Sequence, residues 1–323
     1  MTCNFFPLNN QGQASEIAGT AAPLEKPLQL LMEANLQALL GIRFLATEFS
    51  TGRVHGGRID TLGLDENNCP VIMEYKRSVG ENVINQGLYY LDWLMDHQAD
   101  FKWLVMETLG ADVAASIDWS TPRLLCVAAD FTKFDRHAVQ QIQRHIELLR
   151  YRRFGDDLLL LELAYANNGM LEKRTPKAAD AVAQPYDSAA AHHPPASTPK
   201  QQGPDKRFAE LKASLPAPLL QTLDALEDLV QSFGDDVQCK ELRLYTAFKT
   251  LRNFATVVLQ RSRLLVYLHL DAAVYVPQIQ QHIPATWDVS AIGHSGTGDI
   301  EVSITHLAEL QVFEAYLRLA YET

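Results

Sequence analysis

The segment that decides the fold covers residues 58–96 and reads RIDTLGLDENNCPVIMEYKRSVGENVINQGLYYLDWLMD. In its first half, two runs rich in apolar and β-branched residues flank the turn-forming segment 65–70, DENNCP. This pattern predicts two antiparallel strands joined by a turn. Because side chains alternate along a strand, Glu74 and Lys76 point to one face, where Asp60 on the neighbouring strand faces them. Two carboxylates and an ammonium group are therefore predicted to share one small patch.

This predicted patch has the composition of a site for a divalent cation. Like charges raise each other's pKa unless a cation neutralises them, and Mg²⁺ prefers carboxylate oxygens while it keeps waters for a substrate phosphate. A bound ion of this kind polarises a phosphodiester and lowers the pKa of a water that Lys76 can orient. The pattern thus indicates phosphodiester cleavage. A surface salt bridge between Glu74 and Lys76 is the simpler interpretation of a Glu-x-Lys pattern taken alone.

The second half of the segment, residues 82–96, has helical periodicity. Gln86 and Tyr90 lie one turn apart on a polar and aromatic face, which is expected to look back over the patch and contact nucleic acid. For Trp93, on the same face, packing at the edge of the domain is the preferred interpretation. The apolar face of the helix predicts a buried stripe at helical spacing: Ile84, Leu88, Leu91 and Met95.

Several pieces of the chain, taken in order, resemble the signature of the PD-(D/E)XK nuclease superfamily in its RecB-like branch: Glu33, Asp60, Glu74-Tyr75-Lys76 and Gln86-x-x-x-Tyr90. The usual Pro before the Asp is replaced by Ile59. Over about residues 28–164 the chain is similar to the catalytic domain of NucS-like endonucleases. The resemblance implies a mixed-sheet, restriction-endonuclease-like α/β fold and hydrolysis of DNA.

The resemblance also implies which groups bind the metal. Asp60, Glu74 and the backbone carbonyl of Tyr75 would hold Mg²⁺ or Mn²⁺. Glu33, on a helix predicted from residue 28 to about residue 41, would support this ion or a second one. Since Glu33 sits between apolar neighbours, it needs a polar partner if it is buried; an exposed helix glutamate is the alternative.

The remaining site residues are expected to act on water and substrate. Lys76 would position the attacking water, and Gln86 and Tyr90 would hold the substrate or Lys76. Arginines near the patch are expected to bind phosphates, with bidentate hydrogen bonds where geometry allows: Arg53, Arg58 and Arg77.

Composition describes an ordinary globular protein of 323 residues, with 47% hydrophobic and 21% charged residues. No apolar run approaches the roughly 20 residues of a membrane helix, and residues 1–20 lack the features of a secretory signal. The four cysteines are widely spaced, which favours a reducing cytoplasm over disulfides or a zinc site. The net charge of −11 argues against a protein that coats nucleic acid by bulk charge.

Local patterns extend the prediction to an arm at 1–27, a nuclease-like domain at 28–171, a flexible linker at 172–206 and a small α+β domain at 207–323. In the first domain we expect strands at 44–50, 101–107, 123–129 and 157–164, a short helix at 111–117 and a long helix at 135–151. In the second we expect helices around residue 216, a strand at 237–248, a hairpin at 254–270, a strand at 300–304 and a closing helix from about residue 307.

The second domain is similar to an uncharacterised domain that accompanies such nucleases and has been labelled a predicted transport protein. Because no membrane segment is visible, binding, dimerisation or targeting is expected of it, with a partner that the sequence does not name. Its glycine-rich segment at 293–299 is interpreted as a hairpin turn rather than as an anion site.

The sequence therefore predicts a cytoplasmic, divalent-metal-dependent endodeoxyribonuclease. The alternative is a nuclease-like fold that binds nucleic acid or a nucleotide without cutting it. Non-cleaving relatives usually lose motif residues, whereas this chain retains them, which favours the enzyme. DNA is the expected partner, and a homodimer is a further expectation because some NucS-like proteins act as dimers.

Overall fold

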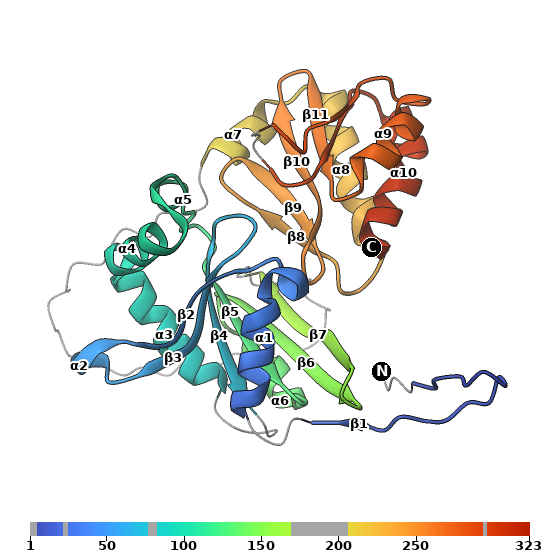
Figure 1. The fold of residues 1–323 in the computed structure, drawn as a ribbon. Helices are drawn as coiled ribbons and strands as arrows, with labels where there is room; N and C mark the ends of the chain where they lie inside the picture. Colours follow the sequence, from blue (N-terminus) through green and yellow to red (C-terminus); the bar gives the residue numbers. More distant parts are fainter. Residues whose placement is uncertain (1–4, 22–24, 77–82, 169–205, 293–295) are drawn as a thin grey trace, which may run out of the picture.

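The computed structural model of the chain describes residues 5–21, 25–76, 83–168, 206–292 and 296–323. These residues form an α/β domain built on a mixed sheet and a second domain built on another sheet (Figure 1). The first sheet has seven strands and the second has six. Within the described parts of the chain, no helix is long and apolar enough to cross a membrane.

The first sheet places the predicted hairpin beside two parallel strands. Its order is β1-β6-β5-β4-β3-β2, with β7 paired to β6. β2, β3 and β4 are antiparallel neighbours, β5 and β6 run parallel to β4, and β7 runs antiparallel to β6. The strands are β1 (Gly19–Thr20), β2 (Arg43–Ser50), β3 (Arg58–Leu64), β4 (Pro70–Lys76), β5 (Arg123–Ala128), β6 (His145–Phe154) and β7 (Leu158–Asn168).

Helices cover both faces of this sheet (Figure 1). On one face, α1 (Glu25–Leu40) buries leucines and a methionine at four-residue spacing against β4, β5 and β6. It ends at Leu40 and is followed by Gly41, whose φ of 63° is a conformation that glycine adopts easily. On the other face lie α3 (Val83–Asp96), α4 (Gln98–Leu109) and α5 (Ala111–Ala115). Two shorter helices complete the domain: α2 (Gly52–His55) and α6 (Lys133–Gln140).

The helix over residues 82–96 is confirmed as α3, but the predicted buried stripe is rotated. Ile84 and Leu91 are buried as expected, whereas Leu88 and Met95 are partly exposed. Gly87 instead faces the sheet, where a Cβ would lie 2.4 Å from Leu124. This close approach turns further side chains of α3 inward, so that the buried set also includes Tyr90, Trp93 and Leu94.

The predicted strand at 101–107 is wrong, because this segment belongs to helix α4. Phe101 and Val105 are buried four residues apart, while the intervening Trp103 is 60% exposed. Four-residue spacing of buried side chains is that of a helix resting on the core. A short apolar run does not by itself separate this case from a buried strand.

The predicted long helix at 135–151 is also wrong, because α6 ends at Gln140 and β6 begins at His145. Ile146 and Leu148 pack on the α3 side of the sheet, and Leu149 and Tyr151 on the α1 side. A strand buried on both faces carries apolar side chains on each of them, as β6 does at 146–151. The apolar residues of this segment therefore fall at intervals that also fit the buried face of a helix. The predicted strands at 44–50, 123–129 and 157–164 and the helix at 111–117 are confirmed.

The second sheet is antiparallel, in the order β12-β13-β11-β10-β9-β8. Helices α8 and α10 pack on its core. The predicted hairpin is confirmed as β10 and β11 and the closing helix as α10, but the predicted strand at 237–248 is two paired strands. The elements are α7 (Lys206–Ser214), α8 (Ala217–Gln231), β8 (Gln238–Glu241), β9 (Tyr245–Lys249), β10 (Asn253–Gln260), β11 (Arg263–Leu268), α9 (Ala272–Gln280), β12 (Thr286–Asp288), β13 (Ile300–Ile304) and α10 (Leu307–Glu322).

The expected arm and linker are described only in part. Residues 5–17 form two isolated β-bridges, and β1 then pairs with the end of β6. The expected linker at 172–206 lies outside the described residues except for Lys206, the first residue of α7.

Candidate active site

The β3–β4 hairpin brings Asp60 and Glu74 together. The register pairs Thr61 with Met73, so the two acidic residues are neighbours across the strands. The backbone N–H of Asp60 donates to Oε1 of Glu74 at 3.2 Å. The backbone N–H of Tyr75 donates to Oδ2 of Asp60 at 3.0 Å. These crossed hydrogen bonds fix both carboxylates at the same point of the hairpin.

The environment of Glu74 strongly disfavours its ionised form. Its side chain is fully buried, and its Oε2 atom has no hydrogen-bond partner. Burial, followed by the nearby Asp60 charge, raises the pKa of Glu74 to about 9. Burial also raises the pKa of Asp60. Unless a bound metal ion neutralises it, Glu74 therefore keeps its proton at neutral pH, despite the nearby charge of Lys76.

A divalent cation fits this pair of residues. The unpartnered Oε2 of Glu74 is a buried acceptor beside a second carboxylate, and buried polar atoms normally have a partner. A cation would displace the proton and neutralise the two charges. Among the described residues, no group of three or more His, Cys, Asp or Glu side chains is placed to hold a metal ion. A cation here would therefore need backbone or water oxygens besides Asp60 and Glu74.

Glu33 lies near the hairpin, where its carboxylate accepts hydrogen bonds from neighbouring side chains. Its Oε1 accepts hydrogen bonds from Thr61 Oγ1 at 2.6 Å and from Gln29 Nε2 at 2.9 Å. Gln29 Nε2 also donates to the backbone carbonyl of Asp60 at 2.7 Å. In this geometry Glu33 braces β3 through Thr61 and Gln29, and its role as a metal ligand stays a prediction.

Lys76 is close enough to affect both carboxylates. It lies two residues beyond Glu74 on β4, with its side chain mostly shielded from solvent. Its charge lowers the pKa of Asp60 and of Glu74, against the larger opposing effect of burial. Its Nζ is 3.7 Å from Oε2 of Glu25 at the start of α1. Among the described ion pairs, the partner of the ammonium is Glu25, and the role of Lys76 at the acidic pair stays a prediction.

Gln86 and Tyr90 support the start of β3. Tyr90 is buried, and its hydroxyl accepts from the backbone N–H of Arg58 at 3.1 Å. Gln86 Nε2 donates to the same hydroxyl at 3.5 Å. A Cβ on Gly57 would lie 2.5 Å from the Tyr90 ring, so only glycine allows this approach. The pair therefore holds the backbone two residues before Asp60, a role that the sequence did not indicate.

The predicted phosphate-binding arginines differ in their surroundings. The Arg58 side chain is exposed and forms an ion pair with Glu48, which also binds Lys26. Arg53 is exposed on α2 and borders a surface cavity of about 410 Å³. Arg77 lies outside the described residues. Phosphate binding by all three stays a prediction.

Comparisons with known proteins match the second domain to a family model and the whole chain to a curated relative. Residues 209–323 match the family described as "Domain of unknown function (DUF5655)". A Haemophilus influenzae protein named "Uncharacterized protein" is 27% identical over 322 residues, which cover 97% of each chain. These two matches concern the second domain and the whole chain, and neither names an activity.

Two solved structures align with a part of the chain. A repair endonuclease from Pyrococcus abyssi is 18% identical, with a TM-score of 0.26 over 41% of this chain and 50% of its own. The structure of an EndoMS–dsDNA complex is 17% identical, with a TM-score of 0.23 over 41% and 47%. The aligned region spans about half the length of both structures. At these scores they carry no argument about fold or activity, so the proposal below rests on the site itself.

Proposed function

We propose that this chain is a divalent-metal-dependent endonuclease that hydrolyses DNA phosphodiesters. The observation that carries the proposal is the buried, unpartnered Oε2 of Glu74 beside Asp60. Burying an acidic group beside a second carboxylate, without a neutralising partner, destabilises a protein. Such a pair is therefore typical of a functional site that a cation completes.

The proposed chemistry assigns one task to each group. Asp60, Glu74 and the carbonyl of Tyr75 would hold Mg²⁺ or Mn²⁺, which when bound supplies charge neutralisation and an acidified water. Lys76, two residues beyond Glu74 on β4, would orient that water. Glu33 keeps Asp60 in place through Gln29 and Thr61, or supports an ion directly, as the resemblance implies.

Substrate contacts and organisation complete the proposal. Backbone phosphates of the DNA would be contacted by Arg53, Arg58 and Arg77. Gln86 and Tyr90 would hold the start of β3 in position beside the DNA. We assign the PD-(D/E)XK-type fold to 28–171, a linker to 172–206 and a separate domain to 207–323. A cytoplasmic location fits the free cysteines of the described residues. We also propose that the protein forms a homodimer, which a measurement of its molar mass by light scattering would test.

The test uses fluorescently labelled single-stranded, duplex, mismatched and branched DNA with Mg²⁺, Mn²⁺ or EDTA. We expect metal-dependent cleavage that is lost in Asp60→Asn, Glu74→Gln and Lys76→Met. Glu314→Gln is the matched control, because this half-exposed carboxylate on α10 pairs only with Arg318 within the same helix among the described ion pairs. Cleavage that survives Glu74→Gln would refute the proposed site. Binding without cleavage under every metal would replace the enzyme by a non-cleaving sensor of nucleic acid.

A further inference from the structure

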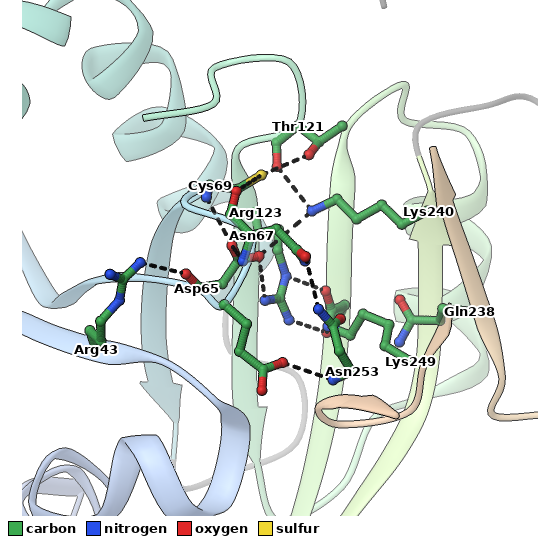
Figure 2. A network of polar contacts seen from close by, with 12 residues as sticks. Arg43, Asp65, Asn67, Cys69, Thr121, Arg123, Gln238, Lys240, Lys249 and Asn253 are labelled. Carbon is green, nitrogen blue, oxygen red and sulfur yellow. Dashed lines mark hydrogen bonds and ion pairs between the residues drawn. The ribbon is translucent and has the colours of Figure 1, made fainter. Parts of the chain in front are cut away.

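A buried polar network closes the β3–β4 turn at the end of the hairpin away from Asp60 and Glu74 (Figure 2). Asp65 Oδ1 accepts from the backbone N–H groups of Asn67 at 2.9 Å and Cys69 at 2.8 Å. Its other oxygen, Oδ2, accepts from Arg123 Nη1 at 2.9 Å. One carboxylate thus shapes the turn and ties it to β5.

Arg123 extends the network to β6. Its Nε and Nη2 donate to the two carboxylate oxygens of Glu147 at 2.7 and 2.8 Å. Asp65, Arg123 and Glu147 are each at most 5% exposed. Two buried carboxylates therefore face one guanidinium, and this leaves a negative charge to be compensated.

The second domain adds two ammonium groups to this cluster, one beside each carboxylate. Lys249 Nζ lies 3.4 Å from Glu147 Oε2, and Lys240 Nζ lies 3.8 Å from Asp65 Oδ2. Lys240 also donates to the backbone carbonyl of Thr121 at 3.4 Å. Both lysines are at most 5% exposed, so their ammonium groups interact with buried groups of the contact and not with solvent.

Neutral groups make the contact specific to the turn. Oδ1 of Asn67 accepts from Tyr245 OH at 2.9 Å and from Asn253 Nδ2 at 2.8 Å. The backbone N–H of Asn253 donates to Glu66 Oε2 at 2.8 Å. Apolar packing of Cys69 against the second domain accompanies these bonds. A domain that touched the turn only loosely would not bury and satisfy so many polar atoms.

We propose that the second domain is a built-in positioning module that clamps the β3–β4 turn and thereby holds Asp60 opposite Glu74. The turn connects the two strands that carry these residues, so its shape sets their register. A slip of one residue would move one of them to the other face of the sheet. The effect on cleavage rests on the proposed function, whereas the clamping of the hairpin does not.

Hydrogen exchange of the full chain tests the clamp directly. The backbone N–H groups of Asp60 and Tyr75 report the local geometry, because each donates to a carboxylate of the candidate site. In Lys249→Met we expect both to exchange at least about tenfold faster while amides of β10 and β11 keep their protection. Lys249→Arg, which retains the charge, should restore at least part of the protection.

Lys212→Met is the matched control, since Lys212 pairs with Glu227 and Glu241 inside the second domain. It should leave the β3–β4 amides unchanged. If Lys249→Met does not fold, Tyr245→Phe removes one bond to Asn67 without uncovering a buried charge, and a smaller acceleration at the same amides is expected. Unchanged exchange at Asp60 and Tyr75, or equal acceleration throughout both domains, would overturn the proposal.

Activity measurements separate this inference from the proposed function. If the unmodified chain cleaves DNA, Lys249→Met should lower kcat and weaken Mn²⁺ binding while KM for DNA stays within about twofold, because a positioning residue acts on the site and not on the substrate. An unchanged kcat would overturn the positioning role. If the unmodified chain neither cuts DNA nor binds metal, the proposed function fails, and the exchange experiment still decides whether the clamp exists.

Discussion

The substitution Glu74→Gln is expected to stabilise the metal-free protein while it abolishes the response to metal. Gln keeps the shape of the side chain and removes the charge. The folded protein raises the pKa of Glu74 from 4.5 to about 9, so between these values the native state binds more protons than the unfolded state. Stability from this group therefore falls as the pH rises through that window.

The size of the effect follows from the same window. Between pH 4.5 and pH 8 the penalty grows by about 1.36 kcal/mol per pH unit, which gives an upper bound of about 5 kcal/mol. Even about 2 kcal/mol of this corresponds to a rise in Tm of roughly 4–8 °C. A cation bound to unmodified protein at about 100 times its Kd should add about 2.7 kcal/mol, and the variant should lose most of this gain.

Thermal unfolding at pH 5 and pH 8, with and without Mn²⁺, measures both effects. The variant should unfold at a higher temperature than the unmodified chain at pH 8, with a much smaller difference at pH 5. Glu314→Gln, the half-exposed control, should show neither effect. A Glu74→Gln protein that is destabilised equally at both pH values would show that Glu74 is not a buried, unpaired acid, and the reasoning would be refuted.

Three further substitutions probe the supports of the hairpin. Gly57→Ala places a methyl group 2.5 Å from the Tyr90 ring, so we expect a loss of about 1–3 kcal/mol in the free energy of unfolding by urea. Tyr90→Phe leaves the Arg58 N–H without its acceptor, which should cost about 1–2 kcal/mol and lower kcat without changing Mn²⁺ affinity more than severalfold; an unchanged urea midpoint would contradict the contact. Asp65→Asn removes a charge from the pair with Arg123 and should cost about 3–5 kcal/mol, measured by the same urea titration; a loss below about 1 kcal/mol would contradict its structural role.

The hairpin was predictable because its information is local. The turn formers at 65–70 and the alternation around Glu74 lie within one segment, and α3 follows directly. The resemblance of its motif to a nuclease signature indicated the same carboxylate pair that the structure brings together. The errors at 101–107 and 135–151 occurred where a helix and a strand bury similar residues, because tertiary packing and not the sequence period decides such segments.

The network at the turn was not predictable from the sequence, because its members lie far apart. Asp65, Arg123, Glu147 and the two lysines of the second domain are charged residues that would ordinarily be assigned to the surface. No local pattern shows that five such residues, spread over nearly 200 positions, are buried together. The one available signal was the density of Asp and Asn at 65–68, which the turn alone was sufficient to explain.

The two ends of this hairpin treat their acidic residues in opposite ways. At the turn, Asp65 is paired; although burial opposes ionisation, the charges of Lys240 and Arg123 prevail, and its pKa is lowered. Its contribution to stability is thus present above the unfolded pKa and is lost as the pH falls through the lower, folded value. At the candidate site, Glu74 lacks a cationic partner at bonding distance among the described residues, and burial raises its pKa. A carboxylate that served only stability would be expected to resemble Asp65. A buried acid with a raised pKa, on a hairpin clamped at its other end, is typical of a functional site, and this contrast with Asp65 is what supports the proposed role of Glu74.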